Sequence, residues 1–171
     1  MSAGRALTPY VGVIGVGDVP ADGELAQTAY AVGRALAGRG ALVVCGGLGG
    51  VMAAACQGAR SAGGTTLGLL PGLARAAANP WVDIVVPTGL GEARNVLVIR
   101  SADAVVAIGG GWGTLSEIAL AVRAGVPVVG VHTWDPVPPG ADTGPVEALA
   151  DPVAAADRAF ELAAARRSRR K

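Results

Sequence analysis

Residues Gly109–Glu117 read GGGWGTLSE and directly follow a short apolar run, AVVAI, at Ala104–Ile108. The run is rich in valine and too short for a helix, which predicts a buried parallel strand. Beyond the glycines, apolar residues recur at the spacing of one helix face: Leu115, Ile118, Ala119 and Val122. That spacing predicts an amphipathic helix, with these side chains on its apolar face. The predicted order is therefore strand, glycine loop, helix.

The start of this helix is a predicted anion site. The first backbone N–H groups of a helix have no internal partner, and the helix dipole is positive at that end. The glycines allow a phosphate to approach the backbone closely, and Thr114 adds a hydroxyl donor. Glu117 lies one turn further on the same side, where the dipole favours its ionised form. Two interpretations of Glu117 stay open: a carboxylate used in chemistry, or one that only responds to the dipole.

Composition indicates one domain without a strong charge preference. The chain has 171 residues, of which 51% are hydrophobic but only 4% aromatic, and 27 are glycine. A length of this order suits a single core, here one built from small residues. The net charge of +1 gives no indication of nucleic acid or membrane binding. Because no apolar run reaches membrane-spanning length and residues 1–9 lack a signal-peptide pattern, we expect a cytoplasmic protein.

Scarce residue types exclude several chemistries. The only lysine is Lys171, which argues against a Schiff base, pyridoxal phosphate chemistry and a Walker-type phosphate loop. His132 is the only histidine, and we expect it to be structural or at a rim. With only Cys45 and Cys56 besides, a zinc site would have too few ligands. We expect both cysteines to be small core residues of a reduced protein, with a reactive thiol at Cys45 as the less favoured alternative.

Strand-like and helical patterns alternate along the chain. We expect strands at 10–14, 41–44, 65–70, 82–86, 104–108 and 127–131. We expect helices at 24–39, around 52–59, at 91–101, after Gly113, and from an N-cap at Asp151 to about Ala165. This alternation predicts an α/β fold: a single domain with a doubly wound, mainly parallel sheet of modified Rossmann type. The domain should span 10–165, between a flexible arm at 1–9 and a basic tail at 166–171.

Three glycine loops should meet at one edge of this sheet. They follow the first, second and fifth strands, and ligands of such sheets bind at the carboxyl ends of the strands. The dinucleotide fingerprint is absent after the first strand, and Cys45–Gly46 stand where the second should end in an acidic residue. The pattern therefore favours a mononucleotide or sugar phosphate over NAD. In the connection 71–80, Arg75 and Asn79 either face the ligand or belong to an exposed loop.

Three stretches carry a family resemblance. GGGWGTLSE resembles the PGGxGTxxE motif of the LONELY GUY family of cytokinin riboside 5′-monophosphate phosphoribohydrolases. GGLGGVM at Gly46–Met52 is similar to the family's second glycine signature, and GEARN at Gly91–Asn95 to its arginine-bearing helix. The resemblance covers about residues 10–131 and is closest to the branch, once misnamed lysine decarboxylases, that includes a molybdenum-cofactor carrier protein. Two residues depart from the pattern: Gly109 replaces the motif's proline, and Asn95 replaces the usual lysine.

The resemblance implies hydrolysis of the N-glycosidic bond of a purine nucleoside 5′-monophosphate, with or without a cytokinin-type N6 substituent. The products would be the free base and ribose 5-phosphate, and neither a metal nor a redox cofactor is needed. Arg94 and Glu117 would be the catalytic residues. Residues expected to bind the AMP-like nucleotide and its phosphate are Gly15, Gly47, Gly49, Gly50, Met52, Asn95, Gly110, Gly111, Trp112, Gly113 and Thr114.

Two alternatives to hydrolysis have some support in the sequence. One is a non-catalytic carrier for a nucleotide or a molybdenum-cofactor-like ligand, which would keep the same glycine loops. The other, nucleic-acid binding through the tail RRSRRK, has no aromatic platform to support it. The segment 91–101 is apolar on most sides, so it must be buried on more than one face. We therefore expect a homodimer or higher homo-oligomer.

Overall fold

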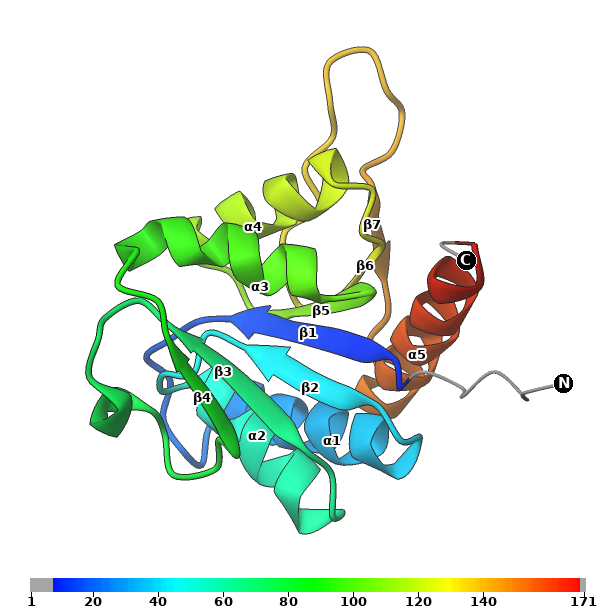
Figure 1. Ribbon diagram of the computed structural model, residues 1–171. Coiled ribbons are helices and arrows are strands. Elements are labelled where there is room, and N and C mark those ends of the chain that lie inside the picture. Colours follow the sequence, from blue (N-terminus) through cyan, green and yellow to red (C-terminus); the bar gives the residue numbers. More distant parts are fainter. Residues whose placement is uncertain (1–7, 170–171) are drawn as a thin grey trace, which may run out of the picture.

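The computed structural model describes residues 8–169, whose strands form one seven-stranded parallel sheet (Figure 1). The strand order is β4-β3-β2-β1-β5-β6-β7. The strands are β1 (Tyr10–Gly15), β2 (Leu42–Cys45), β3 (Thr66–Leu70), β4 (Ile84–Pro87), β5 (Ala104–Ile108), β6 (Val128–Val131) and β7 (Val146–Ala148). The chain moves outward from β1 to β4 and then returns to β5 on the other side of β1. The order of the strands therefore switches direction between β1 and β5, the point where such sheets bind ligands.

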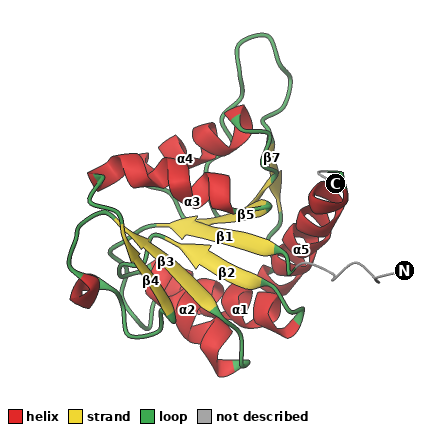
Figure 2. Cartoon of the chain, in the orientation of Figure 1, coloured by secondary structure: helices red, strands yellow, loops and turns green. Residues whose placement is uncertain are grey.

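Helices cover both faces of the sheet, which confirms the predicted doubly wound α/β fold (Figure 2). One face carries α1 (Glu24–Gly38), α2 (Val51–Ser61) and α5 (Pro152–Ser168). The other carries α3 (Asn95–Ser101) and α4 (Trp112–Arg123). Two short 3-10 helices, η1 (Arg75–Ala77) and η2 (Gly91–Arg94), lie in the connections. Within residues 8–169, no helix combines the length and apolar character needed to cross a bilayer.

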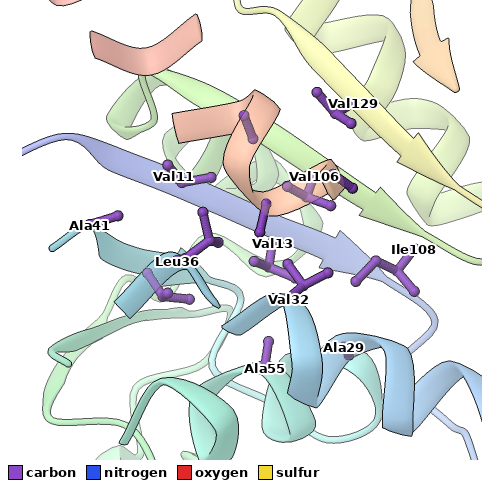
Figure 3. Packing of buried hydrophobic residues seen from close by; sticks show 14 of the residues in the cluster. Val11, Val13, Ala29, Val32, Leu36, Ala41, Ala55, Val106, Ile108 and Val129 are labelled. Carbon is purple, nitrogen blue, oxygen red and sulfur yellow. The ribbon is translucent and has the colours of Figure 1, made fainter. Parts of the chain in front are cut away.

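The core lies on both sides of β1 and β5. Val11 and Val13 of β1 pack with Val106 of β5 against Val32 and Leu36 of α1, and all five are buried (Figure 3). The alternate strand residues point the other way, toward α3 and α4, because successive side chains of a strand face opposite sides. Burial on both faces explains why the central strands read as continuous apolar runs.

Several predicted helix ends are confirmed. Arg39 caps the C-terminus of α1, and Gly40 follows with a φ of +80°, a conformation that favours glycine. Asp151 caps α5 by accepting a hydrogen bond from the Ala154 N–H at 2.7 Å. The predicted end of α5 near Ala165 is wrong, because the helix continues to Ser168.

The extra turn of α5 is fastened to the core by arginines that the sequence assigned to a basic tail. Arg166 donates to the carbonyls of Ala102 and Ala124, at 3.2 and 3.1 Å. Arg167 forms an ion pair with Asp103 at 2.9 Å. Residues 1–7 of the predicted arm, and Arg170 and Lys171 of the tail, lie outside the described residues.

Three other segments differ from the sequence prediction. The segment 91–101 is a 3-10 turn followed by a short α-helix, not one helix. Strand β7 was not predicted, because only Val146 of its three residues is buried and no apolar pattern marks it. The buried face of α4 is also not the predicted one. Instead of the predicted Leu115, Ala119 and Val122, the helix buries Thr114, Glu117, Ile118 and Ala121.

Candidate functional site

A hollow of about 210 Å³ opens at the carboxyl edge of the sheet, beside the switch point between β1 and β5. The end of β1, the glycine loop after β2, the first residues of α2 and α4, and the η2–α3 junction all contribute to it. Among the predicted site residues, those that line the hollow are Gly15, Met52, Arg94, Asn95, Gly111, Gly113, Thr114 and Glu117. The three glycine loops therefore meet at one place, as their positions in the sequence predicted.

The remaining predicted site residues lie outside this lining: Gly47, Gly49, Gly50, Gly110 and Trp112. Gly47 and Gly50 shape the loop after β2, with φ values of +76° and +60° that favour glycine. The indole of Trp112 is exposed and stacks on Trp134. Sequence reasoning missed other residues that line the hollow: Val13, Ile14, Val16, Gly17 and Gly46.

Among the residues that the structure describes, no side chain caps the N-terminus of α4. Its N-cap is Gly111, and its first turn holds no acidic residue. A Cβ added at Gly111 or Gly113 would meet no atom within 4 Å, so space lies open beside the backbone. The helix α2 also begins at a glycine without a side-chain cap, and its Met52 lines the same hollow. The N–H of Val51, at the start of α2, already donates to the carbonyl of Val16 at 3.0 Å, so the first turn of α4 offers the open N–H groups and the positive helix end to an anion.

Arg94 lies at the junction of η2 and α3 and is only 7% exposed. Its Nε atom is buried and has no hydrogen-bond partner within residues 8–169. The guanidinium packs on Gly46, where any side chain would overlap it. Burial lowers the pKa of Arg94, and the nearby Glu117 opposes that shift. A buried N–H without a partner is costly, and a cation that lines a hollow without an ion pair among residues 8–169 is suited to an anionic ligand.

Glu117 reaches the hollow from the sixth residue of α4 and is 8% exposed. Burial raises its pKa to about 7, although Arg94 acts in the opposite direction. The helix dipole was expected to favour the ionised form, but with this pKa part of the Glu117 carboxyl groups are protonated near neutral pH. Glu117 lies beyond the first turn, where the dipole acts, and desolvation outweighs the arginine. Among the described residues, no ion pair joins Glu117 to Arg94.

Other candidate residues have structural positions. Asn79 braces the glycine loop after β2, since its amide donates to the carbonyls of Leu48 at 2.9 Å and Gly47 at 3.3 Å. Arg75 is exposed in η1 and does not line the hollow. His132 is exposed, with its Nε2 atom 3.9 Å from a carboxylate oxygen of Glu24.

The two cysteines are fully buried neighbours. The Sγ atoms of Cys45 and Cys56 lie 3.4 Å apart, next to the loop that supports Arg94. The hydrogen bond with Cys45 and burial raise the pKa of Cys56, while that hydrogen bond lowers the pKa of Cys45. Across residues 8–169 there is no cluster of three or more His, Cys, Asp and Glu side chains suited to a metal.

Comparisons with known proteins agree with this architecture. A model of the SLOG cluster4 family matches residues 8–153. A cytokinin riboside 5′-monophosphate phosphoribohydrolase of Mycobacterium tuberculosis is 36% identical over 125 residues, which is 67% of this chain and 66% of that protein.

Two solved structures of molybdenum-cofactor proteins are also similar. The carrier protein of Chlamydomonas reinhardtii is 37% identical with a TM-score of 0.79, over 91% of this chain and 98% of that one. The binding protein of Rippkaea orientalis is 40% identical with a TM-score of 0.70, over 75% of this chain and 78% of that one.

Proposed function

Because the chain belongs to the SLOG cluster4 family, we propose that it hydrolyses the N-glycosidic bond of a nucleoside 5′-monophosphate. The observation that carries the proposal is that two buried ionisable groups line the same hollow beside the uncapped N-terminus of α4. Arg94 has an unpartnered buried nitrogen, and Glu117 has a pKa of about 7. A carboxyl group that titrates near neutral pH is suited to acid–base work, and its position in a hollow supports a catalytic role.

In this proposal the first turn of α4 binds the 5′-phosphate. The backbone N–H groups of Gly111, Trp112 and Gly113 and the hydroxyl of Thr114 are the donors. The open space at Gly111 and Gly113 leaves room for phosphate oxygens beside the backbone. A nucleoside monophosphate should therefore bind far more tightly than its nucleoside. Gly111→Val, which fits the local backbone but fills this space, should remove that preference in calorimetric titrations of AMP and adenosine.

Bond breakage requires stabilisation of a cation and activation of water. As the C1′–N bond lengthens, positive charge develops on the ribose, as in glycoside hydrolysis. The Glu117 carboxylate would stabilise this charge and accept a proton from the water that attacks C1′. The base leaves with the bonding electron pair and acquires a proton. Arg94 would hold the phosphate or stabilise the departing base.

The finer assignment to a purine, including cytokinin-type N6-substituted purines, is supported by the 36% identity to the Mycobacterium tuberculosis phosphoribohydrolase. Asn95 lines the hollow immediately after Arg94, where the family usually has lysine. The site thus has one fewer positive charge than the family pattern. We expect this substitution to affect substrate preference, since Asn95 faces the same hollow as Arg94 and Glu117.

A second candidate function is a carrier that binds a nucleotide or a molybdenum-cofactor-like ligand without hydrolysis. The similarity to the Chlamydomonas reinhardtii molybdenum-cofactor carrier protein, over 91% of this chain, favours it. An uncapped helix end and a buried arginine suit any phosphorylated ligand. A carrier function does not require a buried carboxyl group beside the anion site. The presence of Glu117 there therefore favours hydrolysis.

Base release and binding, measured on the same variants, separate the two functions. Glu117→Gln should leave AMP affinity within a few-fold but reduce turnover by roughly a hundredfold or more, because the lost charge acts mainly in the transition state. Arg94→Ala should lower turnover and weaken binding. Glu161→Gln, an exposed change on α5, is the control for both assays. If wild-type protein releases no base from AMP or N6-substituted AMP at any concentration, the chain is a carrier.

We also propose that the chain works as a homodimer or larger homo-oligomer. On the outer surface of α3 and α4, Val96 and Val122 are 40% and 41% exposed. A single chain leaves these apolar side chains in water, and a second copy would cover them.

A further inference from the structure

Two tryptophans form a stacked pair beside the hollow. Trp112 is the first residue of α4, and Trp134 lies near the start of the long loop between β6 and β7, which rises past α4 in Figure 1. Their ring centroids are 5.6 Å apart with an angle of 28° between the ring planes. Trp112 is nevertheless 79% exposed. One face of its indole is covered by Trp134, and the opposite face is open.

Contacts with the neighbouring backbone position Trp134 behind the indole of Trp112. A Cβ added at Gly110 would lie 2.7 Å from the Nε1 atom of Trp134. Glycine at this position therefore allows the indole of Trp134 to pack against the loop that precedes α4. Next to Trp134, the carboxylate of Asp135 accepts a hydrogen bond from the Val146 N–H at 3.3 Å. Gly144 packs so closely on Asp135 that any side chain there would overlap the carboxylate. The loop is therefore fastened directly after the tryptophan.

The pair stands between two hollows. Gly111 and Gly113, on either side of Trp112, line the hollow that holds Arg94 and Glu117. Trp134 lines a second hollow of about 390 Å³. The first hollow, at about 210 Å³, is smaller than the roughly 300–1,000 Å³ of pockets that enclose whole drug-sized ligands. A phosphate and sugar held there would leave the attached ring system outside, at the rim where Trp112 lies.

Folding alone does not account for an exposed indole at this position. Apolar surface that remains in water contributes little to stability, and the chain uses few aromatic residues elsewhere. An exposed aromatic face that is backed by a second indole, beside the two glycines that line the hollow, is by contrast a good surface for stacking a planar heterocycle.

We propose that the open face of Trp112, backed by Trp134, stacks on the heterocyclic base of the ligand whose phosphate lies at the N-terminus of α4. The proposal rests on the proposed function for the identity of that ligand, a nucleoside 5′-monophosphate. Because every base has a π-face, the platform selects ligands with a ring over ribose 5-phosphate without distinguishing strongly among bases.

Calorimetric titration with two phosphorylated ligands tests the platform. One is carbocyclic AMP, in which carbon replaces the ribose ring oxygen so that no oxocarbenium ion forms; the other is ribose 5-phosphate. Trp112→Leu should weaken carbocyclic AMP binding about tenfold and ribose 5-phosphate binding less than twofold. Trp112→Phe, which keeps an aromatic face, should lose only a few-fold. Trp81→Phe, in the connection before β4 and away from the hollow, is the control.

The outcomes separate the platform from the hydrolase. If Trp112→Leu leaves carbocyclic AMP affinity unchanged, weakens both ligands equally, or changes the sedimentation coefficient instead, the platform is wrong, whether or not wild-type protein hydrolyses AMP. If binding depends on Trp112 but no base is released from AMP, the platform stands and the hydrolase fails. Failure of both ligands to bind overturns both. Since Trp112 is exposed, we expect its variants to fold, which circular dichroism will verify.

Discussion

At the scale of single residues, the raised pKa of Glu117 makes the free energy of unfolding depend on pH. The ordinary pKa of Glu117 is 4.5 and its folded-state pKa is about 7, so the folded chain binds more protons than the unfolded chain between these values. The contribution of Glu117 to stability is complete below pH 4.5 and is lost as the pH rises through 7. Above that, burying the carboxylate costs on the order of 3 kcal/mol.

Glu117→Gln should therefore stabilise the unliganded protein in a pH-dependent way. Glutamine resembles the protonated acid, so the gain in the free energy of unfolding should be about 2–3 kcal/mol at pH 8 and less than about 1 kcal/mol at pH 5. Urea unfolding at both pH values measures it. Glu161→Gln, which is exposed, should show no such difference. Equal effects of Glu117→Gln at the two pH values would mean that the carboxyl group titrates normally.

The same pKa predicts the pH dependence of the proposed hydrolysis. If the carboxylate is the active form, kcat should rise about tenfold per pH unit below pH 6 and level off above pH 8, because the ionised fraction increases with pH. The second pKa of a phosphate, near 6, also falls within this pH range. Affinity for carbocyclic AMP, measured over the same range, separates the titration of the ligand from that of Glu117. A kcat already constant from pH 5.5 upward would contradict the role given to Glu117.

The backbone conformation at Gly109 explains why this position does not hold the proline of the LONELY GUY motif. The φ of Gly109 is +66°, and its N–H donates to the carbonyl of Val131 at 3.2 Å. The proline of the family motif has a φ near −65° and no N–H, so this loop has a different local backbone. Gly109→Pro should lower the free energy of unfolding by about 3 kcal/mol or more. Gly111→Ala is the control, because Gly111 has a φ of −118° and a Cβ there meets no atom within 4 Å. It should change thermal stability little.

The strand–loop–helix pattern made Glu117 and the glycine loops candidates, and the family resemblance of GEARN made Arg94 one. The sequence could not identify Gly46 as the surface on which Arg94 packs, or Trp134 as the backing of Trp112, because each contact joins segments far apart in the chain. A tryptophan in a loop rich in proline and glycine was the only signal for Trp134. The pKa of Glu117 also depends on burial, which the motif does not show.

At the scale of elements, α1 and α2 pack so closely that their backbones nearly touch. A Cβ on Gly33 of α1 would overlap the carbonyl of Ala55, and a Cβ on Gly58 of α2 would overlap the carbonyl of Tyr30. These glycines therefore set the distance between the helices. In an exposed helix interior, alanine would be favoured over glycine by about 1 kcal/mol.

Gly33→Ala should destabilise the protein by about 1–3 kcal/mol despite the better helix propensity of alanine, because the clash is with backbone atoms. Gly38→Ala, at the end of the same helix, meets no atom within 4 Å and should stabilise by about 0.5–1 kcal/mol. Denaturant unfolding of the two variants measures the difference. A stabilising Gly33→Ala would show that the helices are further apart than described.

Strongly patterned elements were the most predictable. The strand at Ala104–Ile108 is confirmed to the residue, because burial on both faces leaves a continuous apolar run. The face of α4 was predicted wrongly because apolar spacing assumes that a helix buries only apolar side chains. Here the inner positions near the sheet edge are occupied by Thr114 and Glu117, which line the hollow.

At the scale of the whole molecule, the outward face of the α3–α4 layer exposes several apolar side chains. On the α3–α4 side, a hollow of about 160 Å³ lies between the helices, lined in part by Val96, Arg100 and Arg123. Apolar side chains of the same two helices remain partly exposed, among them Leu97 and Val122. Val98 and Ile99 are the buried residues of α3, and they pack toward the sheet. A single chain therefore buries one face of this helix. Burial of the second face, which the sequence predicted, requires another chain.

The wild-type protein should therefore sediment as a dimer or larger oligomer at micromolar concentration. Val96→Arg should favour the monomer, because it adds a positive charge to a hollow that already contains Arg100 and Arg123, and like charges repel across a symmetric interface. Val153→Arg makes the same change at an exposed valine of α5, on the opposite layer, and should leave the sedimentation coefficient unchanged. A wild-type monomer, or equal dissociation by both substitutions, would show that α3 and α4 do not form the interface.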